Sequence, residues 1–142
     1  MSSTHIKALA MIAMMGFFMV SRSDSEPRGI RNHNPGNIRD AAGDTWLGQR
    51  GTDGEFAIFE SPEYGLRALA RLLKNYRDLY DLRTVRGIIN RYAPASENNT
   101  SAYVSHVVSA LGIGPDDSLQ FPAQLPALMA AIIWHENGKQ PY

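Results

Sequence analysis

Apolar residues recur at intervals of three and four over the second half of the chain, which is the spacing of one helix face. The first such segment begins at Ser61-Pro62-Glu63, where a capping residue, a first-turn proline and an early acid mark a helix N-terminus. Its apolar face is formed by Leu66, Leu69, Leu73 and Tyr76. A second helix is predicted between a capping Thr84 and Pro94. Its apolar face is formed by Val85, Ile88, Ile89 and Tyr92.

Two further helices are predicted toward the C-terminus. Thr100 can cap the third, which ends at Gly112. Its apolar positions are Tyr103, Val104, Val107, Val108 and Leu111. The fourth helix is expected from about Pro122 to His135, with Gly138 just beyond its end.

Two short segments before these helices have a different pattern. Residues around Trp46-Leu47 and Phe56-Ala57-Ile58-Phe59 are apolar and aromatic, and Gly51-Thr52-Asp53-Gly54 between them favours a turn. We therefore expect a small β-hairpin. The NHNPGN segment at residues 32–37 is expected to be a loop, because Asn-Pro and Pro-Gly favour turns. Four helices and one hairpin in a single domain give an α+β fold that is mainly helical.

The first 20 residues differ from the rest of the chain. Ala8 to Val20 is an uninterrupted apolar run, preceded by Lys7 and followed by a polar segment. The run is shorter than the roughly 20 residues that span a bilayer, and it is typical of a signal sequence or a weak signal-anchor. Residues 1–20 are therefore predicted to be a signal-anchor or hydrophobic arm, residues 21–28 a linker and residues 29–142 the folded domain.

This organisation predicts export to the periplasm, or anchoring in the inner membrane through residues 6–20 with the positive end inside. No clean cleavage site precedes Ser21, since Phe18, Met19 and Val20 are all large. Two alternatives stay open. The segment can be the N-terminal core helix of a cytosolic protein, or a hydrophobic arm that packs in a larger assembly such as a virion.

Composition narrows the function classes. The chain of 142 residues has 14 basic and 14 acidic side chains, so it lacks the basic surplus of a nucleic-acid binder. It has no cysteine, which excludes disulfides, thiolate zinc sites and a cysteine nucleophile. It also contains no phosphate-binding loop, dinucleotide fingerprint or Ser-His-Asp signature. His33, His106 and His135 are not spaced as a helical zinc motif, so no metal and no cofactor are expected.

A carboxylate at the end of the fourth predicted helix is the main catalytic candidate. Glu136 shares one helical face with the apolar residues Leu125, Leu128, Met129 and Ile132. Desolvation at the edge of an apolar surface raises the pKa of a carboxyl, and a general acid is kept protonated near neutral pH in this way. The alternative is that Glu136 only marks the point where the helix reaches water.

Glycosidic bond cleavage needs such an acid, and often a second carboxylate as base or nucleophile. Glu55 and Asp53 lie in the predicted hairpin, where a turn can direct them across a cleft. Glu97 lies in a polar loop and is expected to be a solvated charge. The aromatic side chains that can stack on sugar rings, or else fill the core, are Trp46, Tyr92, Tyr103 and Trp134.

Several motifs resemble those of phage and prophage virion or lysis proteins in the lysozyme-like superfamily. The most specific is RGIRNHNPGNIR at residues 28–39. It is followed by WLG at residues 46–48, FAIFESPEYG at residues 56–65, YAPASENNTSAY at residues 92–103 and HENG at residues 135–138. The resemblance covers almost everything after residue 27.

The order of these segments is also similar to that of flagellar and autolysin-type N-acetylglucosaminidases, with one difference. In that family the acid-bearing helix comes first, whereas a similar helix, AIIWHENG at residues 131–138, stands at the C-terminus here. The resemblance therefore implies a circularly permuted lysozyme-like domain.

The resemblance also assigns roles to individual residues. Glu136 matches the general acid and Tyr92 the tyrosine of a loop that faces the cleft, so these two are the expected catalytic residues. Asn137 stands where that family has a serine after the acid. The residues expected to bind substrate are Asn37, Trp46, Glu55, Asn98, Tyr103 and His135.

The implied activity is cleavage of the β-1,4 glycan backbone of peptidoglycan without a cofactor. Lytic transglycosylase chemistry with a single glutamate is favoured, in which the C6 hydroxyl of the sugar itself attacks. A hydrolase of the glucosaminidase or muramidase type is the alternative within the same class. Outside it, the alternatives are a non-catalytic glycan-binding virion protein and a membrane-anchored assembly factor.

Overall fold

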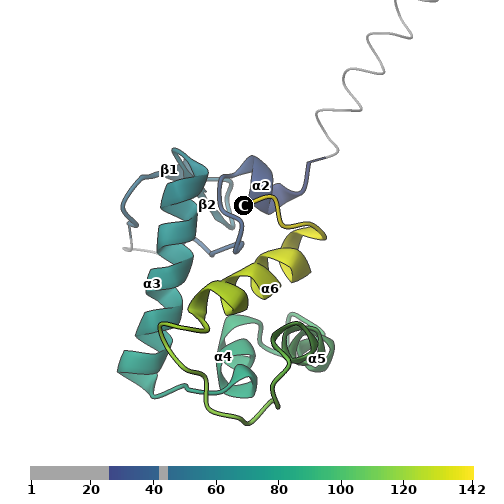
Figure 1. The fold of residues 1–142 in the computed structure, drawn as a ribbon. Helices are drawn as coiled ribbons and strands as arrows, with labels where there is room; N and C mark the ends of the chain where they lie inside the picture. The colour runs from purple at the N-terminus through teal and green to yellow at the C-terminus, as the bar shows by residue number, and fades with distance from the viewer. Residues whose placement is uncertain (1–25, 42–44) are drawn as a thin grey trace, which may run out of the picture.

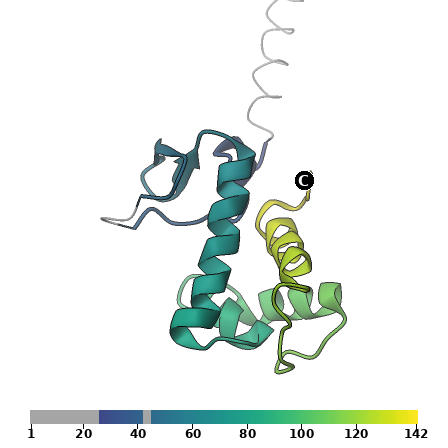
Figure 2. The same cartoon turned by 60° about the vertical axis from the view of Figure 1, so that its left-hand side comes forward.

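The computed structural model describes residues 26–41 and 45–142, which form an α+β domain dominated by helices (Figures 1 and 2). Its elements in chain order are α2 (Arg28–Arg31), β1 (Gln49–Thr52), β2 (Ala57–Phe59), α3 (Pro62–Tyr80), α4 (Val85–Tyr92), α5 (Thr100–Leu111) and α6 (Leu125–Asn137). The prediction of a mainly helical α+β fold is confirmed. The predicted signal-anchor at residues 1–20 and residues 21–25 of the predicted linker lie outside the described residues.

The four long helices form where their caps and apolar stripes predict them, with small shifts at the ends. α6 begins at Leu125, three positions after the expected Pro122. Asn99, and not Thr100, caps α5, because the Oδ1 of Asn99 accepts a hydrogen bond from the backbone N–H of Ala102 at 3.2 Å. No helix within the described ranges combines the length and the apolar character needed to cross a bilayer.

The short helix α2 carries no sequence signal, because four residues are too few to show a period. Arg28, expected to end the linker, is the first residue of this helix. Its side chain is tied to the hairpin loop, with Nε 2.6 Å from the carboxylate of Asp53. Helix α2 therefore begins at Arg28, next to the expected domain start at Gly29.

The strands β1 and β2 pair as a two-stranded antiparallel sheet, which confirms the hairpin but shifts its first strand. Trp46-Leu47 precede β1, and a hydrogen bond from the backbone N–H of Gln49 to the carbonyl of Trp46 at 2.9 Å closes a turn there. The loop between the strands is organised by Asp53, whose Oδ1 accepts from the backbone N–H groups of Glu55 and Phe56. Trp46 therefore does not lie in a strand, and its side chain instead lines a pocket of the domain.

Helix α6 runs through the middle of the domain, between α3 and α5 (Figure 1). Its apolar face is buried in a core built from α3, α4, α5 and β2, whose fully buried members include Phe59, Leu69, Ile89, Val107, Leu128 and Ile132. Each such side chain contributes about 1.5–3 kcal/mol by leaving water. The apolar face therefore fixes α6 in place, and the polar end of the helix emerges beside α2.

Candidate active site

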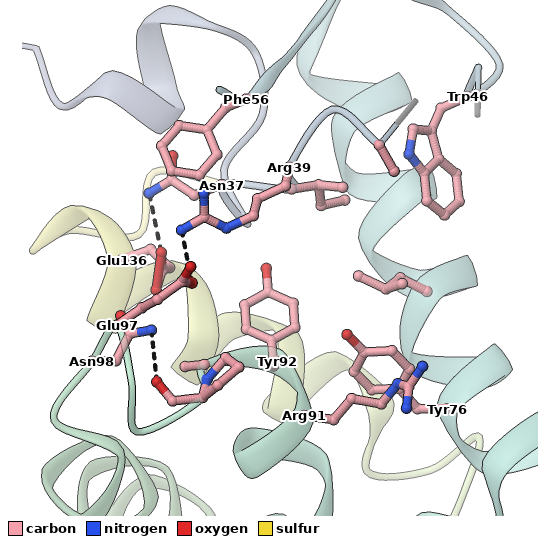
Figure 3. A pocket seen from close by; sticks show the side chains of 15 residues that line it. Asn37, Arg39, Trp46, Phe56, Tyr76, Arg91, Tyr92, Glu97, Asn98 and Glu136 are labelled. Atoms are coloured by element: carbon pink, nitrogen blue, oxygen red, sulfur yellow. Dashed lines mark hydrogen bonds and ion pairs between the residues drawn. The ribbon is translucent and has the colours of Figure 1, made fainter. Parts of the chain in front are cut away.

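A pocket of about 360 Å³ lies where the end of α6 meets the loop after α2, the hairpin, α3 and α4 (Figure 3). We call it the Glu136 pocket. Its lining residues are Asn37, Ile38, Arg39, Ala41, Trp46, Phe56, Leu72, Tyr76, Arg91, Tyr92, Ala93, Pro94, Glu97, Asn98 and Glu136. Five of the eight expected site residues are brought together in it, namely Glu136, Tyr92, Asn37, Trp46 and Asn98.

Asparagine side chains attach the end of α6 to the loop after α2. The Nδ2 of Asn37 donates to Oε1 of Glu136 at 3.1 Å, although the two residues are 99 positions apart in the chain. The Nδ2 of Asn137 donates to the backbone carbonyl of Pro35 at 2.7 Å and to that of Ile133 at 2.9 Å. Asn137 thus links α6 to the loop at the position where the resembling family has serine, and this link holds Glu136 within reach of Asn37.

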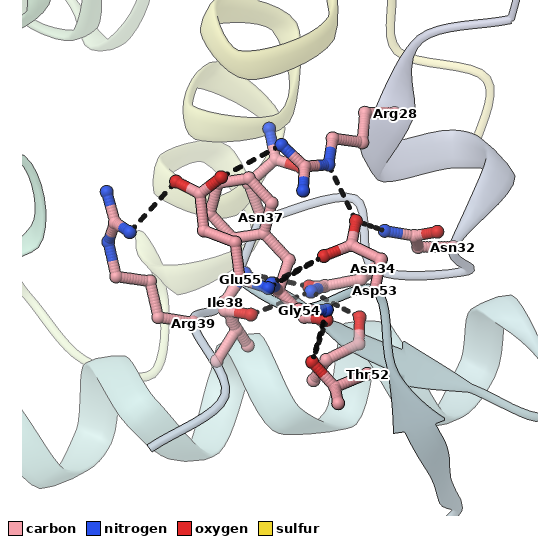
Figure 4. A network of polar contacts seen from close by, with 12 residues as sticks. Arg28, Asn32, Asn34, Asn37, Ile38, Arg39, Thr52, Asp53, Gly54 and Glu55 are labelled. Atoms are coloured by element: carbon pink, nitrogen blue, oxygen red, sulfur yellow. Dashed lines mark hydrogen bonds and ion pairs between the residues drawn. The ribbon is translucent and has the colours of Figure 1, made fainter. Parts of the chain in front are cut away.

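The loop itself is shaped by a buried asparagine (Figure 4). Asn34 donates from Nδ2 to the carbonyls of Ile38 and Ala57, each at 2.9 Å, and its Oδ1 accepts from the N–H of Ile38 at 2.9 Å. Asn37 then adopts a left-handed backbone with a φ of 50°, which asparagine tolerates better than most side chains. In this conformation the Asn37 side chain reaches Glu136.

Burial raises the pKa of the Glu136 carboxyl above its ordinary value, because desolvation disfavours the charged form. Opposing effects come from the hydrogen bond of Asn37, the hydroxyl of Tyr103 and the charge of Arg39, all of which lower that pKa. The net result is a carboxyl that keeps its proton to a higher pH than an exposed glutamate would. A general acid needs this property.

Tyr92 forms the pocket wall beside Glu136. Its hydroxyl donates a hydrogen bond to the carbonyl of Gly36, and a Cβ at Gly36 would lie only 2.7 Å from the hydroxyl oxygen. Burial raises the pKa of Tyr92 well above its ordinary value, and the charge of Glu136 adds to the effect. Tyr92 therefore stays neutral. The hydroxyl proton of Tyr92 is donated to the carbonyl of Gly36. The lone pairs of the hydroxyl oxygen can therefore accept a hydrogen bond or stabilise positive charge in the pocket.

The other carboxylates near the pocket are held in ion pairs (Figures 3 and 4). Arg39 binds Glu55 through Nη1 and Glu97 through Nη2, each at 3.0 Å. Arg28 binds the second oxygen of Glu55 at 3.0 Å and also binds Asp53, whose pKa it holds well below the ordinary range. Glu55 was expected to bind substrate, but its carboxylate is engaged in this network and does not line the pocket.

Tyr103 and His135 also lie outside the pocket lining. The Tyr103 side chain is 1% exposed, and its ring stacks on that of His135 with centroids 3.6 Å apart. Its hydroxyl lies close enough to Glu136 to lower the pKa of that carboxyl, although within the described part of the chain it forms no hydrogen bond of good geometry. Neither side chain lines the Glu136 pocket, because the Tyr103 ring is packed in the core against that of His135. An aromatic residue on the apolar face of a helix has the same sequence pattern whether its ring is packed in the core or lines a pocket.

The histidines do not gather around a site for a metal. His106 and His135 share a hydrogen bond between Nδ1 atoms 2.9 Å apart, whereas the Nδ1 of His33 lies 3.2 Å from the carbonyl of Phe59. Desolvation and the charge of His106 lower the pKa of His135. Across residues 26–41 and 45–142, no group of three or more His, Asp or Glu side chains is placed to hold a metal ion.

Several lining residues are not found by sequence reasoning. Glu97, expected to be a solvated loop charge, lines the pocket and pairs with Arg39, which lines it too. Tyr76 and Arg91 also line it. Arg39 ends the RGIRNHNPGNIR motif, so a signal for it was present. Tyr76 has the pattern of a core position and Arg91 that of a solvated one, so nothing in the sequence distinguishes either.

A comparison with known proteins gives one informative match. The chain is 38% identical over 139 residues to Protein P5 of Pseudoalteromonas phage PM2, and the match covers 94% of this chain and 86% of that protein. No family model matches the chain. The matched relative is a bacteriophage protein, which agrees with the phage origin expected from the motifs.

Proposed function

We propose that this chain, which belongs to the family of Protein P5 of Pseudoalteromonas phage PM2, cleaves the β-1,4 glycan backbone of peptidoglycan with Glu136 as the proton donor. The observation that carries the proposal is the state of the Glu136 carboxyl, which is partly buried, raised in pKa and held by Asn37 at the wall of a pocket. The aromatic rings of Trp46, Phe56 and Tyr76 line the same pocket and offer faces on which sugar rings stack.

Cleavage begins when Glu136 donates its proton to the glycosidic oxygen, which leaves with the next sugar. The bond between that oxygen and C1 breaks, and positive charge develops on the ring, where the oxygen of Tyr92 can stabilise it. The C6 hydroxyl of the same sugar then attacks C1 and gives its proton to the Glu136 carboxylate. The product carries a 1,6-anhydro ring, no water is consumed, and Glu136 is protonated again.

The ion pairs around the pocket favour this single-acid chemistry. Hydrolysis with two carboxylates needs a second carboxylate whose oxygen is free to activate water or to attack C1. Both oxygens of Glu55 are bound, one by Arg28 and one by Arg39, and Oε2 of Glu97 is bound by Arg39, which leaves Glu136 as the pocket-lining carboxyl with no arginine partner. Glu136 is then the carboxyl available to act first as acid and afterwards as base.

We further propose that the domain is a circularly permuted lysozyme-like fold. The end of α6 lies beside α2, and Lys139 is 3.5 Å from Glu26 (Figure 1). The end of the acid-bearing helix is therefore adjacent to the segment that follows this helix in the glucosaminidases. A chain joined at this point would run from α6 directly toward the Asn34–Asn37 loop, which supports the permutation.

The relative is a bacteriophage protein, and the proposed role of this chain is at the host cell wall, either from the virion or during release of progeny. The proposed partner is the glycan strand of peptidoglycan. Residues 6–20 are proposed to hold the protein at a membrane or in a virion assembly, which leaves the pocket free to reach the strand.

Digestion of purified murein, followed by mass spectrometry of the soluble products, tests the proposal. Muropeptides with anhydro ends are expected. Glu136→Gln should slow their release by about 10²- to 10⁴-fold, the usual contribution of a general acid. Glu60→Gln is the matched control, because Glu60 is exposed and does not line the pocket.

Reducing ends in place of anhydro ends would make the protein a hydrolase with the same acid. Intact murein after incubation with folded protein would overturn the proposed activity. A non-catalytic, glycan-binding role in the virion would then be the remaining reading of the pocket.

A further inference from the structure

A second hollow continues the Glu136 pocket along α3 and α4. It encloses about 610 Å³, and we call it the Tyr80 groove. The residues that it shares with the Glu136 pocket are Trp46, Leu72, Tyr76, Arg91 and Pro94. Because five lining residues are common to both, one extended ligand can occupy the two without leaving the protein surface.

Arg91, which lies beside Tyr76 (Figure 3), lines both hollows and places a positive charge where they meet. Its Cζ lies 3.6 Å from the ring centroid of Tyr80 and 5.4 Å from that of Tyr76. A guanidinium stacked on a ring keeps its N–H groups available for a carboxylate, which it can bind through two hydrogen bonds.

The two arginines of the site differ in their partners. Arg39 is neutralised by Glu55 and Glu97. Arg91 forms an ion pair with no carboxylate of residues 26–41 or 45–142. The Glu136 end of the site is therefore balanced in charge, whereas the Tyr80 end presents a cation.

Exposed apolar side chains flank this cation. Leu79 is 70% exposed and Tyr80 51% exposed, both at the end of α3. A ligand that suits the groove carries a carboxylate together with small apolar groups. In peptidoglycan the stem peptides have these properties, whereas the sugars of the backbone, whose lactyl groups are joined to the peptides, do not.

We propose that the Tyr80 groove binds the stem peptide of the glycan strand, and that Arg91 pairs with a carboxylate of that peptide. The inference rests on the proposed function, because the same strand places its glycosidic bond at Glu136. It adds a specificity to that function: strands that carry peptides are bound in preference to strands that lack them.

Calorimetric titration of the full chain tests this. The Glu136→Gln protein is titrated with two soluble glycan fragments of equal length, one with its stem peptides and one stripped of them by an amidase and then amidated at the lactyl carboxylates that the amidase exposes. We expect the peptide-bearing fragment to bind about three- to tenfold more tightly, the range for a partly exposed charge pair. A third fragment with amidated peptide carboxylates should bind like the stripped one.

Two variants in the same background assign the effect to Arg91. Arg91→Gln should bring the ratio of the two affinities close to one. Arg67→Gln should leave the ratio unchanged, because Arg67 is an exposed arginine of α3 that lines neither hollow.

Equal affinity for the two fragments, an undiminished ratio in Arg91→Gln, or no binding of either fragment would overturn the inference. The wild-type digestion of murein tests the proposed function separately. Cleavage without discrimination between fragments would remove only the role of Arg91. Discrimination without cleavage would keep the groove and leave a protein that binds peptidoglycan but does not cut it.

Discussion

Glu136 holds its proton more tightly in the folded chain than in the unfolded one, because burial raises its pKa. Such a group contributes most to stability below its unfolded pKa, and this contribution is lost as the pH rises through the folded pKa. Above the raised pKa the ionised carboxyl therefore opposes folding, and the amide of Asn37 offsets part of that cost. A residue that suits catalysis is in this way unfavourable for stability.

Replacing this carboxyl by an amide should stabilise the protein. In Glu136→Gln the buried charge is absent, so we expect the Tm at pH 7 to rise by about 2–5 °C while murein cleavage is lost. The difference in Tm should vanish near pH 4, where the wild-type carboxyl is also neutral. Calorimetric scans at the two pH values measure it, and a variant less stable than wild type at pH 7 would contradict the assignment.

The contact between Asn37 and Glu136 can be separated from the backbone conformation of Asn37. Asn37→Gly removes the donor but keeps a residue that tolerates a φ of 50°, so the pKa of Glu136 should rise further. Asn37→Ala removes the donor and adds about 1–2 kcal/mol of left-handed strain. Carboxyl NMR titration and chemical denaturation measure the two effects. An unchanged Glu136 pKa in both variants would show that the hydrogen bond is not formed.

At the scale of elements, the sequence predicts where the long helices lie along the chain, but it predicts few of the contacts that hold the elements together. Apolar stripes locate α3 to α6, and side chains cap α4 at Thr84 and α5 at Asn99, whereas α3 and α6 begin without a side-chain cap hydrogen bond. The helix α2 is held by Arg28 pairing with Asp53, a contact between distant residues that no periodic pattern encodes. The sequence pattern around Trp46 is that of a strand, because the contacts that place Trp46 in the pocket wall also come from residues distant in the chain.

The residues of the candidate site also differ in whether the sequence predicts them. Glu136 is located by the apolar face of its helix, and Asn37 and Tyr92 by a motif resemblance. Tyr103 is buried and does not line the pocket, and a helical stripe by itself does not distinguish a ring in the core from a ring in a cleft. Arg91 and Glu97 are missed, because their roles depend on which loops meet in space.

The packing of α3 against the loop after α2 gives a test at this scale. A Cβ at Gly65 would lie 2.0 Å from the carbonyl oxygen of His33. Gly65→Ala should therefore destabilise the protein by about 1–3 kcal/mol, although alanine favours a helix by about 1 kcal/mol over glycine. Gly51→Ala, where no atom lies within 4 Å, is the control for denaturation midpoints. A Gly65→Ala protein as stable as wild type would show that the loop does not pack this closely.

At the scale of the whole molecule, stability depends on pH through groups that act in opposite directions. Burial and the charge of His106 lower the pKa of His135, so the unfolded chain binds that proton more readily. Stability is therefore lost as the pH falls from the ordinary histidine value of 6.5 through the lowered pKa. The pairing of Asp53 with Arg28 acts at lower pH, since its contribution is lost as the pH falls below the ordinary value of 3.8.

The contribution of the histidine pair can be isolated in the Glu136→Gln background, where the opposing carboxyl is absent. There the Tm should fall between pH 7 and pH 5, and adding His106→Gln should make this fall smaller, because the like charge next to His135 is removed. Thermal melts at both pH values provide the comparison. An equal or larger fall in the double variant would mean that the pair does not govern acid sensitivity.

The proposed function depends most on Glu136 acting as a protonated donor to a glycan, and the rate of murein solubilisation against pH measures this directly. The wild-type rate should fall as the pH rises through the raised pKa of Glu136, at a pH above the 4.5 of an ordinary glutamate. The Glu136→Gln rate should be about 10²- to 10⁴-fold lower and should lack this fall. Activity that persists undiminished in Glu136→Gln, or a wild-type rate that falls at the ordinary glutamate value, would contradict the account.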